Sequence, residues 1–134
     1  MKESLRLNPP IPASSRLMTE ECVIDGYTVP KGVNANISLY GVNHHHEFWT
    51  EPNRFDPERF TKEASSGRDP FCFLPFSAGS RNCIGQRFAM IEIKVLLCHL
   101  MRHFRIVSDE VDVEKTRGLT LKPLNPLMFS FTRR

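Results

Sequence analysis

A helical repeat of apolar residues dominates the second half of the chain, from Ile84 to about Phe104. Apolar side chains recur there every three or four positions, which is the spacing of an α-helix. The stripe that they form contains Ile84, Phe88, Ile91, Ile93, Val95, Leu96, Leu97, Cys98, Leu100, Met101 and Phe104. A stripe this broad predicts a long helix that is buried on most sides.

Alternating patterns predict two small antiparallel β-hairpin regions, one on each side of this helix. In residues 21–29, Asp25-Gly26 lies between β-rich flanks, which is typical of a type I′ turn. Residues 33–39 alternate apolar and polar, so we expect this strand to join the hairpin in one three-stranded sheet. Residues 119–131 alternate again around a turn at 124–126, which predicts a second hairpin.

Prolines predict where the shorter elements end. Residues 2–7 read as a helix end, because Asn8-Pro9-Pro10 cannot continue a helix. A helix of two turns is marginal alone, which suggests that the segment is cut from something longer. Residues 9–16 should be extended and lead into a short strand. Asp56 before Pro57 has the pattern of an N-cap, which predicts a one-turn helix over residues 57–60.

Composition narrows the possible functions. The 134 residues are enough for one modest domain, and the net charge of +3 is mild. Basic residues do not alternate with aromatic residues along a stripe, so nucleic acid is not an expected partner. The sequence contains no apolar run that would cross a bilayer and no apolar core of a signal peptide, so we expect no anchor or signal in this chain.

Cysteine and histidine spacing does not favour a zinc site. The four cysteines contain no C-x-x-C pair, and we interpret Cys22, Cys72 and Cys98 as small apolar residues packed on strand or helix faces. Three consecutive histidines, residues 44–46, point in different directions on any regular element. A zinc-binding module built from them is therefore the least favoured hypothesis.

The loop from Phe76 to Gly85 has the features of a thiolate ligand site. Cys83 comes directly before the predicted helix, where free backbone N–H groups and the positive end of the macrodipole lower a thiol pKa. Gly79 and Gly85 would let the backbone pass close to a large flat ligand, and Arg81 adds a fixed positive charge. The alternative from spacing alone is a core cysteine at the base of a core helix.

These residues resemble the cytochrome P450 family of haem-thiolate monooxygenases. The family signature F-x-x-G-x-R-x-C-x-G is complete, at Phe76, Gly79, Arg81, Cys83 and Gly85. Residues 3–6 match the family's E-x-x-R helix, and residues 57–60 match its P-E-R-F element. The run from residue 73 to residue 86 is most similar to the eukaryotic fatty-acid ω-hydroxylase branch.

The resemblance implies a fold and a cofactor. Residues 1–134 would be the C-terminal part of a single domain, an α+β fragment of the mainly α P450 fold, without its membrane anchor and oxygen-activating helix. The cofactor would be haem b (iron protoporphyrin IX), and Cys83 would be the iron ligand. The other residues implied at the haem are Arg16 and Arg81 on the propionates, Phe76 near the ring, and Gly79 and Gly85 in the loop. No residue of this chain is assigned a catalytic role.

The resemblance also implies a function and partners. The chain would belong to a monooxygenase that inserts one oxygen atom of O₂ into an apolar substrate such as a fatty acid, while this fragment alone would be inactive. Residues 11–14 and 116–121 would line the substrate pocket. An NADPH-dependent flavoprotein reductase or a small redox protein would dock near Arg87 and Lys94, and the full-length relative would lie in the endoplasmic reticulum membrane. The alternative is a non-catalytic truncated or pseudogene product that keeps only the proximal haem-binding half.

The same resemblance gives one ion pair a structural role. On spacing alone, Glu3 and Arg6 would be a surface pair that contributes little. In the family, the E-x-x-R and P-E-R-F elements form an interior charge network, which would in this chain contain Glu3, Arg6 and Arg59.

Overall fold

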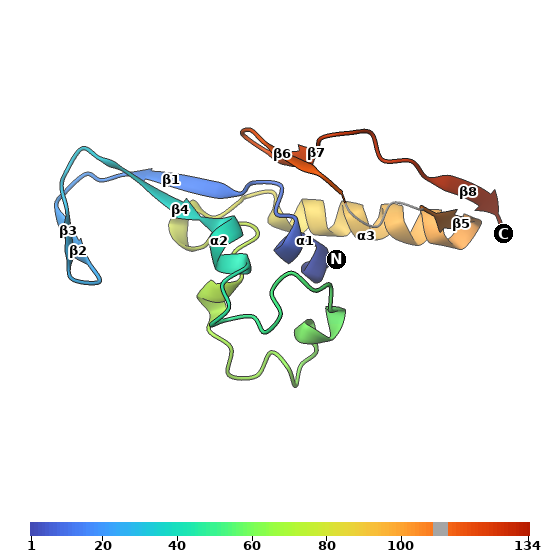
Figure 1. Cartoon of the computed structure of the whole chain (residues 1–134), viewed down its shortest axis with the longest axis horizontal. Coiled ribbons are helices and arrows are strands. Elements are labelled where there is room, and N and C mark those ends of the chain that lie inside the picture. The colour runs from blue at the N-terminus through green and yellow to red at the C-terminus, as the bar shows by residue number, and fades with distance from the viewer. Residues whose placement is uncertain (109–112) are drawn as a thin grey trace. The chain divides into compact units, whose positions relative to one another are not determined.

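Two compact units make up the chain, Met1–Ser77 and Ala78–Arg134. The structure is a computed structural model, and it describes residues 1–108 and 113–134 (Figure 1). Within these residues the strands form four two-stranded antiparallel sheets. Each unit contains two of these sheets together with short helices or one long helix.

The strands of the first unit confirm the predicted hairpin. It consists of β2 (Cys22–Ile24) and β3 (Tyr27–Val29), which pair with Ile24 opposite Tyr27. Asp25 and Gly26 between them have φ values of 49° and 81°. A type I′ turn requires positive φ at both central residues, and this requirement explains the Asp-Gly sequence.

The predicted three-stranded sheet is wrong. The strand β4 (Asn34–Ser38) pairs with β1 (Ala13–Leu17), not with the hairpin. The Met18 N–H donates to the Val33 carbonyl at 2.9 Å, and the Gly32 N–H donates to the Met18 carbonyl at 2.8 Å. These bonds continue the β1–β4 ladder and leave β2–β3 as a separate hairpin beyond it (Figure 1). Alternation predicts which face of a strand is covered, but it does not predict the strand's partner.

The short helices of the first unit include the two predicted ones, at residues 2–7 and 57–60, and two that were not predicted. The helix α1 is Lys2–Leu7, and α2 is Leu39–Asn43 with the Ser38 side chain accepting from the Gly41 N–H at its start. The 3₁₀ turns η1 (Pro57–Phe60) and η2 (Pro70–Cys72) each begin with proline after an aspartate that caps a backbone N–H. The buried apolar side chains that form the core of this unit are Leu39, Trp49 and Cys72, and Pro9 is also fully buried.

The second unit contains one long helix and four short strands. The helix α3 is Gln86–His103, and the 3₁₀ turn η3 (Gly79–Arg81) precedes it. The strand β5 (Phe104–Val107) pairs with β8 (Ser130–Arg133), and β6 (Lys115–Arg117) pairs with β7 (Leu121–Pro123) (Figure 1).

The predicted C-terminal hairpin is therefore wrong, because the strands on either side of residues 124–126 do not pair with each other. The Leu124 N–H donates to the Glu114 carbonyl at 2.9 Å and extends the β6–β7 ladder. The Arg134 N–H donates to the His103 carbonyl at 2.9 Å and extends the β5–β8 ladder. Residues 124–126 thus belong to the connection between β7 and β8, which lie in different two-stranded sheets.

The existence of the long helix is confirmed, but its burial is not. No residue of α3 is buried, Phe88 is 71% exposed, and Ile84 lies before the helix with its side chain fully exposed. Cys98 is also exposed, so its interpretation as a packed core residue is wrong. Periodicity shows which side chains can share a covered face, whereas the covering element must come from elsewhere. Among the described residues, no helix is long and apolar enough to span a membrane.

Candidate functional site

A buried ion pair lies at the centre of the first unit. Arg6 donates two hydrogen bonds to the Glu3 carboxylate, Nε to Oε2 and Nη2 to Oε1, both at 2.8 Å. Glu3 is 2% exposed and Arg6 is 0% exposed. Their i, i+3 spacing on α1 brings the two side chains to one face of the helix. A planar guanidinium matches a carboxylate in this paired geometry, which makes the contact strong and directional.

The remaining N–H groups of Arg6 bind the backbone of distant segments. Nη1 donates to the carbonyls of Asn43 at 2.8 Å and Pro52 at 2.7 Å, and Nη2 donates to the Arg54 carbonyl at 3.2 Å. Asn43 ends α2, and the other two acceptors belong to the segment that leads to η1. The Arg6 guanidinium thus connects α1 to the end of α2 and to the segment before η1. The Glu3–Arg6 pair therefore stabilises the interior of the unit and is not a surface ion pair.

Two further groups contact the Glu3 carboxylate, and one of them, the Arg59 side chain, completes a charge network of three residues. The Asp56 N–H donates to Glu3 Oε1 at 3.0 Å, and Arg59 Nε lies 3.5 Å from the same oxygen as an ion pair without a hydrogen bond. Burial raises the pKa of the Glu3 carboxyl. The hydrogen bonds from Arg6 and Asp56 and the charges of Arg6 and Arg59 outweigh burial, and they hold this pKa below its ordinary value of 4.5. The interior network of Glu3, Arg6 and Arg59 is confirmed.

The low pKa of Glu3 gives the first unit a pH-dependent stability. A carboxylate whose folded-state pKa is depressed contributes stability above its unfolded-state pKa, and this contribution is lost as the pH falls through the folded-state value. We expect the stability advantage of the natural chain over Glu3→Gln to be full near pH 7 and to shrink below pH 4.5. Urea unfolding of both proteins, followed by Trp49 fluorescence across this range, measures it. An advantage that stays constant with pH would contradict the ionised state of Glu3.

A cluster of arginine and aromatic side chains around Trp49 lies beside the charge network. The spacing of residues in the sequence does not predict this cluster. The guanidinium carbons of Arg6 and Arg68 lie 4.9 Å and 4.5 Å from the Trp49 ring centroid. Trp49 is 1% exposed and also contacts Phe60 and Phe73. Cation–π contacts of this kind are strongest where water is excluded. The chain's single tryptophan was the one feature that could have indicated this cluster beforehand.

The cysteine loop places an exposed thiol just before α3. Cys83 is a free, exposed cysteine, and its carbonyl accepts from the Gln86 N–H at 3.3 Å as the helix begins. Gly85 is the N-cap and offers no side chain, so the first N–H groups of α3 have no side-chain cap. The exposed Cys83 thiol thus lies two residues before the N-cap of α3.

Glycine geometry keeps the surroundings of this sulfur open. A Cβ on Gly85 would lie 3.8 Å from Cys83 Sγ, in van der Waals contact with it, so glycine leaves this position beside the sulfur free of a side chain. Gly79 has φ of 77°, which glycine adopts without strain. Ile84 and Phe88 are exposed on the same loop and the first turn of α3. A free thiol with exposed apolar neighbours and no side chain at Gly85 fits a thiolate-bound, largely apolar group such as haem.

Two arginines, Arg16 and Arg81, offer positive charge that is not paired with a carboxylate among the described residues. Arg16, on β1, donates from Nη1 to Ser14 Oγ and to the Ser15 carbonyl, both at 2.9 Å, and from Nη2 to Ser77 Oγ at 3.5 Å. These acceptors are neutral. Within residues 1–108 and 113–134, neither Arg16 nor Arg81 forms an ion pair. Their charges are thus available to an anionic ligand.

The predicted haem residues divide between the two units. Arg16 and Phe76 belong to the first unit, while Gly79, Arg81, Cys83 and Gly85 belong to the second. The structure brings Gly85 next to the Cys83 sulfur, and it brings Ser77 to Arg16. Ser77 was not anticipated from the sequence, although its φ of 61° marks it as an unusual loop residue.

Comparisons with known proteins agree on one family. The family model described as Cytochrome P450 matches residues 1–131. The chain is 46% identical over 123 residues to cytochrome P450 4F12 and to cytochrome P450 4F2 of Homo sapiens, covering 91% of this chain and 24% of each relative. It also matches the solved haem domain of cytochrome P450DA with a TM-score of 0.89 and 31% identity, covering 99% of this chain and 30% of that one. The chain spans about a quarter of the length of the curated relatives that it matches.

Proposed function

This chain belongs to the cytochrome P450 family, and on that premise we propose that it forms the haem-binding part of a monooxygenase that oxidises an apolar substrate. The observation that carries the proposal is the free thiol of Cys83, exposed two residues before the N-cap Gly85 of α3, where no side chain is present. An identity of 46% to P450 4F proteins supports it. We assign residues 1–134 to the C-terminal part of one P450 domain.

Within this proposal, the residues of the cysteine signature together with Arg16 hold the cofactor rather than the substrate. The family's haem supplies the oxygen-activating redox chemistry when it is bound. Cys83 would hold the iron through its thiolate sulfur, and Gly79 and Gly85 would let the loop backbone approach the ring. Arg16 and Arg81 would pair with the two propionates, and Phe76 would pack beside the thiolate loop. In the part of the chain that the structure describes, the guanidinium groups of Arg16 and Arg81 have no ion-pair partner, which supports their assignment to these carboxylates.

The charge network contributes by fixing the segment that leads to the loop. Arg6 and Glu3 hold α1, α2 and η1 together through hydrogen bonds to Asn43, Pro52 and Asp56. A cofactor site needs its supporting residues locked by packing and hydrogen bonds, because small displacements weaken binding and activity. We infer that Glu3, Arg6 and Arg59 are positioning residues that act through the backbone and touch neither substrate nor haem.

Substrate and partners follow from the branch to which the chain is similar. The proposed substrate is a fatty acid or another apolar molecule, with residues 11–14 and 116–121 lining its pocket. The proposed electron donor is an NADPH-dependent flavoprotein reductase or a small redox protein. Arg87 and Lys94 are exposed on α3, which suits an acidic partner surface. The proposed location of the full-length protein is the endoplasmic reticulum membrane.

A chimaeric enzyme tests the proposed function. The segment of cytochrome P450 4F12 that matches this chain is replaced by the 123 matching residues of the chain itself. We expect the chimaera to bind haem and to oxidise the parent's own substrate with NADPH and reductase, and we expect Cys83→Ser to abolish that activity. The parent enzyme and a Cys98→Ser chimaera are the matched controls, since Cys98 is another exposed thiol of the second unit.

The second candidate is a non-catalytic product that keeps only the proximal haem-binding half. The observation that favours it is α3, which leaves its apolar stripe uncovered among the described residues. A chimaera that folds and binds haem through Cys83 but has no monooxygenase activity would support this candidate over the enzyme. A chimaera that binds no haem would contradict both.

A further inference from the structure

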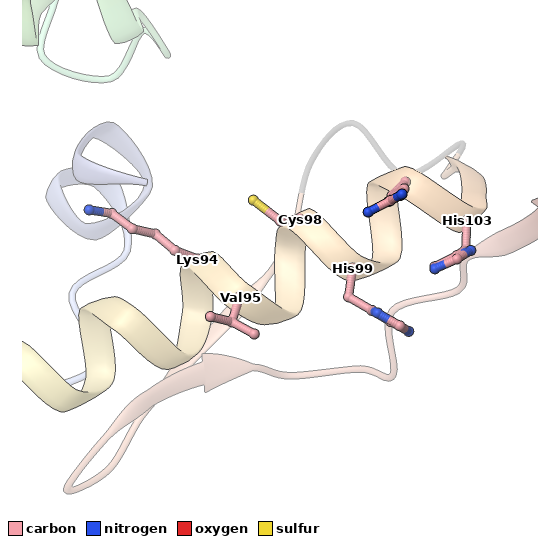
Figure 2. Close-up of a pocket in the computed structure, with 6 residues that line it drawn as sticks. Lys94, Val95, Cys98, His99 and His103 are labelled. Atoms are coloured by element: carbon pink, nitrogen blue, oxygen red, sulfur yellow. The ribbon is translucent and has the colours of Figure 1, made fainter.

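A pair of histidines lies on the last turns of α3, outside the cysteine loop. His99 and His103 are four residues apart on the helix, and their ring centroids are 4.6 Å apart with an interplanar angle of 56°. Figure 2 shows both imidazoles leaving the helix on the same side as Val95, with the sulfur of Cys98 on the other side. This i, i+4 spacing places two imidazoles where one metal ion can reach both.

The two imidazole rings are exposed, and among the described residues they form no hydrogen bond or ion pair with another side chain. Both residues are exposed, and within residues 1–108 and 113–134 their rings contact each other without a hydrogen bond or an ion pair to another side chain. They line a hollow of about 380 Å³ together with Lys94, Val95, Cys98 and Arg102 (Figure 2). Water or another small ligand can therefore complete the coordination of an ion held by the two rings.

A backbone hydrogen bond holds the last turn of α3, the turn that carries His103. His103 is the last residue of α3, and helix ends commonly fray because their carbonyls lack partners. In this chain the Arg134 N–H donates to the His103 carbonyl at 2.9 Å, which ties the last turn to β8. The regular i, i+4 geometry of the two rings is thus supported by the C-terminal strand.

We propose that His99 and His103 form a two-imidazole site for a borderline divalent transition-metal ion, with Zn²⁺ as the probe. Neutral imidazole nitrogen is a preferred ligand of Zn²⁺, Ni²⁺ and Cu²⁺. Three or more clustered ligands of the metal-binding types are not found among the described residues, so the protein supplies two ligands and the solvent supplies the rest. Lys94 and Arg102 carry positive charge at the same hollow, and they weaken the attraction for a dication. The proposal does not rest on haem or on the proposed function.

Site-resolved NMR of the full chain tests the proposal. Imidazole ring signals are followed during titration with Zn²⁺, because this readout separates His99 and His103 from the exposed cysteines and from residues 44–46. We expect the signals of the two rings to shift together with one shared affinity. His103→Gln should weaken that affinity about tenfold, because a chelate of two imidazoles becomes a single ligand. Arg102→Gln, which removes a repelling charge and keeps both rings, should strengthen it.

A spacing control separates chelation from mere histidine content. Met101→His combined with His103→Gln keeps the number of histidines on α3 but places them at i and i+2, on different faces. Met101 is 58% exposed, so the change should leave the fold intact, as the backbone NMR spectrum would show. We expect this variant to bind Zn²⁺ as weakly as His103→Gln does. Equal binding by the spacing variant and the natural chain, or independent titration of the two rings, would overturn the proposal.

Discussion

Replacing Arg6 with methionine should destabilise the first unit by about 3–5 kcal/mol, because it leaves the buried Glu3 carboxylate without its main partner. The change also removes the donor to the carbonyls of Asn43, Pro52 and Arg54. Methionine keeps much of the length of the arginine stem, so the loss reports charge and hydrogen bonds more than volume. Urea unfolding followed by Trp49 fluorescence measures the effect, since Trp49 is 1% exposed and lies beside Arg6.

The chain contains a matched control for this prediction. Glu51 and Arg54 form an ion pair with the same i, i+3 spacing and an N–O distance of 2.9 Å, but their side chains are 64% and 63% exposed. Arg54→Met should cost less than about 1 kcal/mol, because water screens an exposed pair. If Arg6→Met leaves too little folded protein, Glu3→Gln combined with Arg6→Met should recover part of the stability. Equal losses for Arg6→Met and Arg54→Met would contradict the structural role of the network.

Replacing Cys83 with serine should remove thiolate ligation of haem by this chain. A serine hydroxyl is a far weaker acid than a thiol, so serine does not supply the thiolate sulfur that cysteine supplies as an iron ligand. We expect haem titration of the full chain to show a large loss of affinity in Cys83→Ser, together with loss of the thiolate-type absorption. The experiment compares natural chain and variant under the same reducing conditions, so that thiols stay free.

Two further comparisons locate this effect at the cysteine loop. Cys98→Ser removes another exposed thiol of the second unit and should leave haem binding unchanged. Arg16→Gln and Arg81→Gln should each weaken binding without altering the thiolate spectrum, because they are assigned to the propionates rather than to iron. A Cys98→Ser variant that loses haem as completely as Cys83→Ser would show that the assignment of the ligand is wrong.

Local chemistry predicted the short elements of this chain well. The Asp25-Gly26 turn, the Asp56 cap before η1 and the end of α1 before Pro9 all depend on residues next to each other. Strand partners were not predictable in the same way. Alternation in residues 33–39 indicated a strand but not its partner, which is β1, and the hydrogen bonds of Met18 with Val33 and Gly32 continue that ladder.

Burial was the property that sequence patterns predicted least. Glu3–Arg6 and Glu51–Arg54 have identical spacing, yet one pair is buried and the other is exposed. Spacing alone favoured a surface role for Glu3–Arg6, and only the family resemblance indicated its interior position. The apolar stripe of α3 led to the opposite error, because an amphipathic pattern does not reveal whether a covering element is present. Arg68 on Trp49 joins residues far apart in sequence, so no periodicity could indicate it.

The carbon monoxide difference spectrum of the reduced, haem-loaded chain tests the central claim most directly. The account predicts a red-shifted Soret band of the thiolate type in the natural chain and its loss in Cys83→Ser. The five histidines of the chain offer a different possible ligand. A Soret band of the imidazole type that persists in Cys83→Ser would show that a histidine, not Cys83, holds the iron, and it would contradict the assignment of this loop.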